Sequence, residues 1–234
     1  MVDDLDDPPK RPVILNAVGG LCNRLRAILS YRAVYRVLDV LWLRDEYVSF
    51  AGWSDVFMPL PGVRFLDHGP FTAEDYAPHR RSTVGWEDGY RDLRPTPELA
   101  VTVDAHISVM RIDRPRYVAA HIRRTDHVPN FPEPLPPLEG YAAWARSFDA
   151  PLWLATDNEA TRGRMRELVK CNTGPWIGGR EEQGLTDHHR NGRLHEAVID
   201  LFMCVYADAF LGTPGSSFTD TIHVMRRLRA TPRV

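Results

Sequence analysis

The sequence predicts an α/β protein with two lobes and parallel sheets. Short apolar runs, typical of buried strands, alternate with longer stretches of helical spacing in both halves of the chain. The segment 111–115 (RIDRP) is polar, ends in proline and precedes the most apolar strand pattern, at 117–122, so it separates the halves. We therefore predict a disordered lead at 1–12, an N-terminal α/β domain at 13–112 and a C-terminal domain at 113–234.

In the first half, residues 13–18 (VILNAV) predict a strand that ends in a glycine pair, and apolar side chains at helical spacing follow over 21–37. Proline in the first turn favours a helix from Pro97 to about Met110. Residues 69–95 are polar and weakly periodic, which indicates loops and short helices. The other predicted elements are strands at 40–43 and 63–66 and a short helix at 53–58.

The second half continues the alternation of strands and helices. Its buried strand at 117–122 is followed by an amphipathic pattern, and a charged loop is predicted at 181–193. The predicted strands are 117–122, 152–155, 176–177 and 209–212. The predicted helices are 138–148, 159–169, 195–206 and 216–229. Ligands of open α/β sheets bind at the carboxyl ends of the strands, so we expect the functional residues directly after these strands.

Composition excludes several classes of protein. The net charge of -2 disfavours nonspecific binding to nucleic acid. Cys22, Cys171 and Cys204 are widely spaced and form no CxxC pair, which indicates neither disulfides nor a zinc site and favours the cytoplasm. The N-terminal residues 1–12 lack the pattern of a signal peptide, and no apolar run reaches the roughly 20 residues of a membrane span. The oligomeric state is left open.

A glycine turn connects the first strand to the first helix, in the segment 19–26 (GGLCNRLR). Glycine allows a ligand to approach the backbone, and the N–H groups at a helix start attract anions. A purely structural interpretation stands beside the functional one, because tight strand-to-helix turns also need glycine, and the segment is neither GxGxxG nor a P-loop.

The segment 121–127 (HIRRTDH) leaves the end of a buried strand. Alternation places His121, Arg123 and Thr125 on one face and Arg124 on the other. A buried arginine must be paired, because an unpaired buried charge is costly. For Arg124 we expect an internal salt bridge with Asp126 or another acid, and for Arg123 an external anion such as a diphosphate.

Three later segments carry polar residues at predicted helix starts or among apolar neighbours. Ser216 or Ser217 is suited to cap the last helix, and the same hydroxyls could hold a phosphate. Asp157 or Asn158 is expected to cap the helix at 159–169. Asp200 lies among apolar neighbours and needs hydrogen-bond donors, for which a guanine ring is one source and a backbone or arginine partner is the plainer one. The polar loop 187–189 (DHH) does not predict a metal site.

Taken together, five motifs resemble the GDP-fucose-dependent fucosyltransferases: GGLCNRLRA, HIRRTD, LATDN, HEAVIDLF and FLGTPGSSF, in that order. The resemblance is strongest to the α-1,6 branch, which includes the nodulation enzymes, and more distant to the protein O-fucosyltransferases. It implies a GT-B-like fold of two facing Rossmann-type domains, with the acceptor side in 13–112 and the GDP-sugar in 113–234. It also implies inverting transfer of L-fucose from GDP-fucose to a glycan hydroxyl, with neither metal nor cofactor.

The resemblance assigns roles to the candidate residues. Arg123 would hold the β-phosphate, His121 and Asp200 would contact guanine, and the first domain would face the donor or acceptor through the glycine turn. The pocket for phosphate and fucose would be lined by Ser216, Ser217 and Phe218, and the first domain's candidates are Gly20, Asn23 and, as a lesser one, Arg24.

The catalytic base is where the sequence departs from the α-1,6 pattern. That branch has a lysine after the HxRRTD motif and a glutamate a few residues later, whereas His127 and Phe131 stand here. A base must accept the proton of the attacking hydroxyl, and the candidates are Glu133, Asp126 and His127. The alternatives are a GDP-binding module or inactive paralogue, or the same fold acting on another nucleotide sugar.

Overall fold

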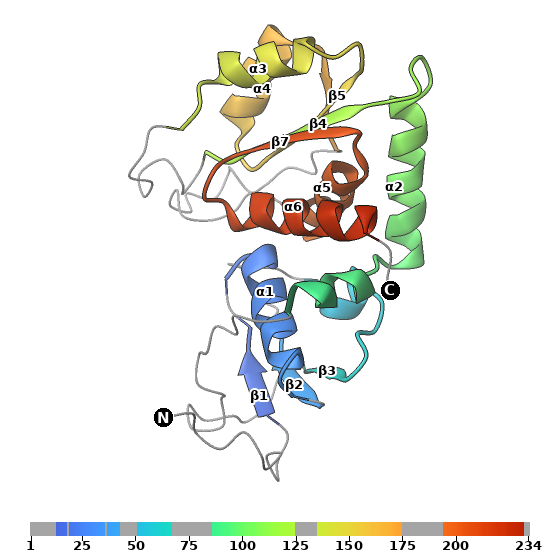
Figure 1. Cartoon of the computed structure of the whole chain (residues 1–234), viewed down its shortest axis with the longest axis vertical. Coiled ribbons are helices and arrows are strands. Elements are labelled where there is room, and N and C mark those ends of the chain that lie inside the picture. The colour runs from blue at the N-terminus through green and yellow to red at the C-terminus, as the bar shows by residue number, and fades with distance from the viewer. Residues whose placement is uncertain are drawn as a thin grey trace. The chain divides into compact units, whose positions relative to one another are not determined.

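The computed structural model describes residues 13–17, 19–35, 37–42, 51–66, 86–124, 135–174 and 194–231. The contacts within the chain divide it into two compact units, residues 1–94 and 95–234. Each unit has its own parallel sheet (Figure 1). The two-lobed α/β class predicted from the alternation of strands and helices is confirmed.

The first unit contains a three-stranded parallel sheet in the order β1-β2-β3. Its strands are β1 (Val13–Asn16), β2 (Leu38–Leu41) and β3 (Val63–Leu66), and its helices are α1 (Leu21–Arg32) and the 3-10 helices η1 (Trp53–Asp55) and η3 (Trp86–Asp92). Aromatic rings fill the core beside the sheet, where the rings of Trp53 and Phe65 stack with their centroids 4.1 Å apart. An ion pair between Arg32 and Asp92, 2.7 Å long, links α1 to η3.

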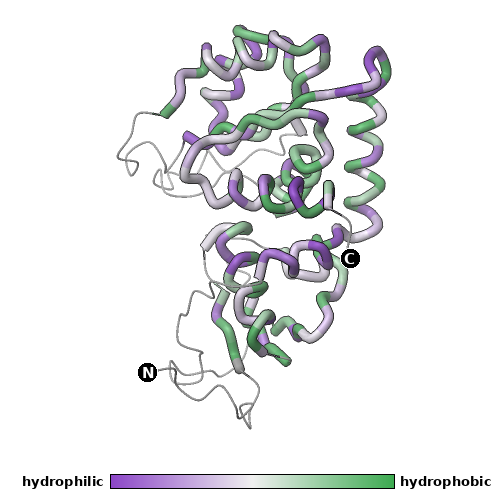
Figure 2. Tube along the Cα trace, in the orientation of Figure 1, coloured by the Kyte–Doolittle hydropathy of each residue, from purple (hydrophilic) through white to green (hydrophobic). Residues whose placement is uncertain are grey.

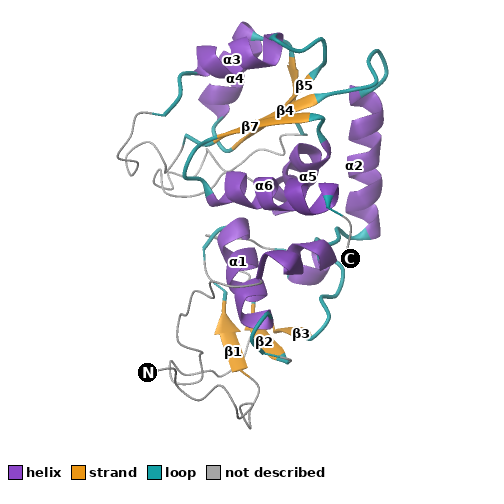
Figure 3. Cartoon of the chain, in the orientation of Figure 1, coloured by secondary structure: helices purple, strands orange, loops and turns teal. Residues whose placement is uncertain are grey.

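The second unit contains a four-stranded parallel sheet in the order β6-β5-β4-β7. The strands are β4 (Val118–Ile122), β5 (Leu152–Thr156), β6 (Cys171–Asn172) and β7 (Ala209–Gly212). Helices α3 (Leu138–Arg146) and α4 (Glu159–Leu168) lie on one side of this sheet. Helices α2 (Pro97–Met110), α5 (Leu194–Tyr206) and α6 (Ser217–Ala230) complete the unit, with α5 and α6 on the opposite side (Figure 3).

Burial explains why the second sheet is so apolar. All five residues of β4 and all five of β5 are buried, as expected for central parallel strands that are covered by helices on both faces. Val118, Ala120 and Ile122 pack against α3 and α4, so alternation turns Ala119 and His121 toward α5 and α6. Figure 2 shows the hydrophobic residues concentrated along the sheet and α5. The sheet ends are therefore fixed on a rigid core.

Some predictions about the elements differ from the structure, and others lie outside the described residues. Helix α1 ends at Arg32 rather than near residue 37, because the chain turns there to enter β2 and leaves the Val37 side chain 62% exposed. The short strand β6 was not predicted, since two residues leave no periodic pattern. The strand predicted at 176–177 and the loop predicted at 181–193 lie outside the described residues.

The division into units also differs from the boundary predicted at 112/113. Helix α2 belongs to the second unit because it packs on α5 and on the edge of the sheet. The His106 ring lies 5.1 Å from the Trp153 ring, and the amide nitrogen of Asn172 lies 3.1 Å from the Met110 sulfur. The proline-containing segment at 111–115 is thus a turn within the second unit, and the structural boundary lies between Arg94 and Pro95.

Candidate functional site

Polar residues gather where β4 and β7 end side by side. The strand register pairs His121 with Gly212 on β7 and with Ala155 on β5, so the residues that follow these strands emerge at one edge of the sheet. This is the carboxyl edge, where open α/β sheets bind their ligands. The sequence motifs around 121–124, 155–158 and 212–220 meet at this edge.

A buried hydroxyl at Thr213 joins the two strand ends. Its Oγ1 accepts a hydrogen bond from the Arg123 backbone N–H at 2.9 Å and donates one to the His121 carbonyl at 3.1 Å. The Tyr141 hydroxyl lies 3.3 Å from the same Oγ1, and burial raises the pKa of Tyr141, which keeps this hydroxyl protonated. Thr213 is 1% exposed, so these bonds are shielded from water. The backbone at Arg123 is therefore held in one position.

The side chain of Arg123 is 12% exposed and lies beside Asp157, with its Nε 4.0 Å from Oδ2. At this separation the two groups attract without forming a short hydrogen bond. The other oxygen of Asp157 accepts a hydrogen bond from the Arg124 backbone N–H at 3.2 Å. Asp157 thus orients this turn, and Asn158 caps α4 instead, accepting from the Thr161 N–H at 2.7 Å. The prediction of a cap at 157 or 158 is confirmed for Asn158.

The salt bridge expected between Arg124 and Asp126 stays a prediction, because Asp126 lies outside the described residues. The Arg124 guanidinium donates a hydrogen bond to the Pro136 carbonyl, just before α3 begins. The nearby acid, Asp157, lies by Arg123. Neither Thr213 nor Tyr141 was predicted as a site residue, although Thr213 belongs to the FLGTPGSSF motif.

His121 is buried on the opposite face of β4, against the first turn of α6. Its Nδ1 lies 2.9 Å from the Thr219 Oγ1, and its ring lies 4.7 Å from the Phe218 ring. The helix can approach this closely because residue 212 is glycine: a Cβ there would lie 2.3 Å from the Thr219 Cγ2. Two predicted site residues, His121 and Phe218, are therefore in contact.

The N-terminus of α6 has an unusual cap. Ser216 occupies the N-cap position, but its side chain makes no capping bond. Its Oγ is buried and has no hydrogen-bond partner within the part of the chain that the structure describes. Gly215, with φ +70, makes the turn that precedes it. The first N–H groups of a helix have no intrahelical acceptor, a feature that attracts anions to such an end, and the phosphate-binding role of Ser216 stays a prediction.

Asp200, on α5, accepts a hydrogen bond from the Trp153 indole N–H, with the two atoms 3.0 Å apart. The sequence interpretation favoured a backbone or arginine partner, and the structure supplies an indole instead. Trp153 points to the α5 face because it alternates with Leu152 and Leu154, which face α3 and α4. Burial raises the pKa of Asp200 to about 7, although the indole and Arg162 oppose this shift. Burial also lowers the pKa of the nearby His106.

The three candidates of the first unit lie at the start of α1. Gly19 has φ +88, a conformation that favours glycine, and Gly20 is the N-cap of the helix. Asn23 is exposed, whereas Arg24 is 2% exposed. The Arg24 Nε donates to the Gly19 carbonyl at 2.8 Å, and its guanidinium lies 4.7 Å from the Trp42 ring centre. Arg24 therefore closes the turn and packs in the core, and its donor-binding role stays a prediction.

The candidate bases Glu133, Asp126 and His127 lie outside the described residues, as does the loop 187–189. Among the residues that are described, no three or more of His, Cys, Asp and Glu are grouped so that they could hold a metal ion. A search of the same residues for a helix long and apolar enough to cross a membrane found none.

Comparison with known proteins gives matches in structure only. No protein-family model matches the chain, and no curated protein matches its sequence. The structure of NodZ alpha-1,6-fucosyltransferase soaked with GDP-fucose has a TM-score of 0.57 at 15% identity, over 92% of this chain and 93% of that one. POFUT1 in complex with GDP has a TM-score of 0.60 at 12% identity, over 94% and 96%.

A structure of the fucosyltransferase NodZ from Bradyrhizobium is similar, with a TM-score of 0.54 at 14% identity, over 92% of this chain and 93% of that one. At these identities the likeness concerns the fold. The GT-B-like class implied by the motifs is thereby confirmed, and the chain has the fold of the fucosyltransferases that its sequence resembles.

Proposed function

We propose that this protein is an inverting, metal-independent glycosyltransferase that moves L-fucose from GDP-fucose to a hydroxyl group of a glycan acceptor. The observation that carries the proposal is the placement of Arg123, whose backbone is fixed by Thr213 beside the open N-terminus of α6. The motif resemblance and the fold likeness to fucosyltransferases in complex with GDP or GDP-fucose support the choice of donor.

The reaction breaks the bond between the anomeric carbon of fucose and the β-phosphate oxygen. The acceptor oxygen forms the new bond to that carbon from the opposite face, and the electron pair of the broken bond leaves with GDP. Negative charge therefore grows on the β-phosphate in the transition state. A bidentate guanidinium at Arg123 and the N–H groups at the start of α6 are suited to stabilise it, which is why the proposal needs no metal.

Different residues of the second unit suit different chemical groups of the donor. Ser216 offers a buried hydroxyl to a phosphate oxygen, and Ser217 and Phe218 follow it in the first turn. Asp200 offers a carboxylate to the N1–H and 2-amino groups of guanine, and His121 lies on the same face of the sheet. His121 pairs with Ala155, two residues beyond Trp153, so the Trp153 backbone lies about 7 Å along the strands from the level of His121. Asp200 contacts the indole of that tryptophan.

The acceptor proton needs a base, and we propose Glu133, Asp126 or His127 for this role on the sequence alone. Replacing each with Gln, Asn and Gln respectively tests the assignment. Loss of transfer with GDP binding retained identifies the base. Retained turnover in all three variants contradicts the proposed set of candidates.

The first experiment measures binding of GDP, UDP and dTDP by calorimetry and transfer from GDP-fucose to a panel of glycans. We expect GDP to bind best, and fucose to appear on the acceptor with the anomeric configuration opposite to that in the donor. A chelator such as EDTA should leave the rate unchanged. Tight GDP binding without turnover on any acceptor would instead indicate a GDP-binding module, and preference for UDP or dTDP another nucleotide sugar.

The matched pair Arg123→Lys and Arg124→Lys tests the proposed role of the guanidinium. Lysine keeps the charge but cannot make two parallel hydrogen bonds, so Arg123→Lys should lower kcat by about a hundredfold or more. Arg124→Lys retains a donor for the Pro136 carbonyl and should keep most of the activity. Equal activity of the two variants contradicts the bidentate role of Arg123.

We further propose a cytoplasmic location, supported by the free thiols of Cys22, Cys171 and Cys204. Fractionation of the cells that produce the protein, with alkylation of these thiols before lysis, tests this location. Recovery of the protein with oxidised thiols outside the cytoplasm contradicts it.

A further inference from the structure

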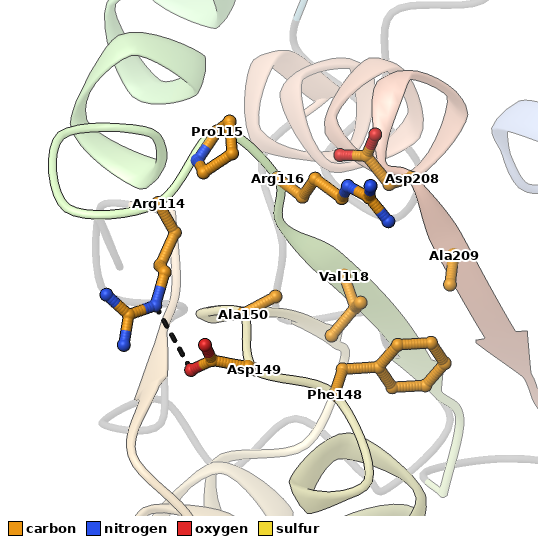
Figure 4. A pocket seen from close by; sticks show the side chains of 9 residues that line it. All are labelled: Arg114, Pro115, Arg116, Val118, Phe148, Asp149, Ala150, Asp208 and Ala209. Carbon is orange, nitrogen blue, oxygen red and sulfur yellow. Dashed lines mark hydrogen bonds and ion pairs between the residues drawn. The ribbon is translucent and has the colours of Figure 1, made fainter.

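A second pocket lies at the amino-terminal edge of the second unit's sheet, at the opposite end of the strands from Arg123 and Thr213. It has a volume of about 390 Å³ and is formed by the segments that enter β4 and β7 and by the turn after α3 (Figure 4). Val118, the first residue of β4, lines it. At a rise of about 3.3 Å per residue, Val118 lies about 13 Å from Ile122 at the other end of the strand. The pocket is therefore separate from the proposed donor site.

Part of this pocket is apolar. Val118, Ala150 and Ala209 line it, and the Phe148 side chain extends beneath Val118 (Figure 4). Phe148 is 38% exposed, which leaves apolar surface available, and its ring contacts the Trp144 ring at 5.1 Å between centroids. Ligand pockets of this size are built from such apolar walls with a few polar groups that orient the ligand.

Both acids that line the pocket are already engaged. Asp149 accepts a hydrogen bond from the Arg114 Nε at 3.1 Å. Asp208 Oδ2 accepts one from the Tyr117 backbone N–H at 3.0 Å and lies 3.5 Å from an Arg111 nitrogen. The carboxylates of both acids therefore interact with groups other than the Arg116 guanidinium.

Arg116 is the unbalanced charge of the pocket. In the view of Figure 4 its guanidinium lies between Asp208 and Val118, and it makes no hydrogen bond or ion pair with the residues that the structure describes. A guanidinium presents paired N–H donors that match a carboxylate. The two neighbouring acids favour a ligand with one negative charge over a dianion, because a second charge adds repulsion without adding a cationic partner.

We propose that this pocket binds a small organic monoanion, with its carboxylate on Arg116 and an aromatic or aliphatic body against Phe148 and Val118. The proposal does not depend on fucosyl transfer. Its ligand class follows from a guanidinium without a partner among the described residues, two engaged acids and an apolar wall in a single cavity.

The test uses the full chain and 3-phenylpropionate as the probe, with binding followed by ligand-observed NMR and calorimetry. We expect saturable binding, and about tenfold or greater weakening in Arg116→Gln and in Phe148→Ala. Arg227→Gln, which removes an exposed arginine of α6 outside the pocket, is the charge-matched control and should bind like the wild type. Circular dichroism of each variant verifies the fold.

Two further probes separate charge from apolar contact. The uncharged 3-phenylpropanamide should bind at least tenfold more weakly than the carboxylate, and dianionic phenyl phosphate should not bind more tightly than it. The proposal is overturned by absence of saturable binding at millimolar 3-phenylpropionate. It is equally overturned by wild-type affinity in Arg116→Gln, by equal binding of the amide or by tighter binding of phenyl phosphate.

Discussion

Asp200 links the stability of the second unit to pH. Burial raises the pKa of its carboxyl from 3.8 to about 7 in the folded protein. Between these values the folded state holds a proton that the unfolded state releases, so stability falls as pH rises from about 4 to about 7 and levels off above. One proton corresponds to about 1.4 kcal/mol per pH unit. Between pH 5 and pH 8 the free energy of unfolding therefore falls by about 2–3 kcal/mol. Solvation of the carboxyl by water would make this decrease smaller.

Asp200→Asn removes this titration while keeping an oxygen that can accept from the Trp153 indole. The substitution should stabilise the protein by about 1–3 kcal/mol more at pH 8 than at pH 5. Urea unfolding at the two pH values, followed by hydrogen exchange of the α5 amides, measures this difference. Asp220→Asn, which changes an exposed acid of α6, is the control and should show no such difference. An equal effect of Asp200→Asn at both pH values would refute the reasoning.

The same carboxyl connects pH to the proposed donor base. Guanine donates from N1–H and its 2-amino group, so it binds the ionised form of Asp200. With a pKa of about 7, guanosine should bind about tenfold more weakly at pH 6 than at pH 8. Guanosine carries no phosphate, which removes the titration of the ligand from the comparison. A pH-independent affinity, or the same pH dependence in Asp200→Asn, would contradict this contact.

Three further substitutions test the packing of the second unit. Gly212→Ala should destabilise the second unit by about 1–3 kcal/mol, because the new Cβ would clash with the Thr219 side chain. In urea unfolding the double variant Gly212→Ala/Thr219→Ala should recover part of the lost stability. An unchanged midpoint in the single variant contradicts the close approach. Thr213→Val should lower the free energy of unfolding by about 1–3 kcal/mol, because it leaves the Arg123 N–H and the His121 carbonyl without their partner. Hydrogen exchange of the Arg123 amide should become faster, and unchanged exchange would contradict the role of the Thr213 hydroxyl. Arg226→Met should lower the free energy of unfolding by a similar amount, about 1–3 kcal/mol, because Arg226 donates to the Cys204 carbonyl in α5 and to the Asp208 carbonyl after it. Thermal unfolding at an unaltered temperature would exclude this role.

Most of the local elements could be predicted from the sequence, because their signals are local. Helix α2 begins at Pro97 and ends at Met110 as predicted, since proline suits the first turn and the apolar spacing stops there. Strand β3 also has its predicted bounds, Val63–Leu66. Strand β6 was not predicted, because its two residues form a strand through pairing with β5 and show no periodic pattern of their own.

The candidate site was predictable in its residues and less so in their partners. The motifs placed His121, Arg123 and Ser216 directly at strand ends and a helix start, where α/β sheets bind ligands. The partner of Asp200 is a tryptophan on another strand, and the acid near Arg123 follows a strand 34 residues further along the chain, at Asp157. Contacts of this kind depend on which strands are neighbours, which no local pattern encodes.

The sequence by itself determined the α/β class, the order of strands and helices, and the residues that gather at the strand ends, because periodicity and turn chemistry act over short distances. Only the tertiary structure decided that α2 belongs to the second unit, that Thr213 joins the ends of β4 and β7, and that Arg116 lines a separate pocket. These features arise where segments distant in the chain pack together. Their physical cause is the burial of apolar faces, which selects neighbours, and the resulting need of each buried polar group for a partner.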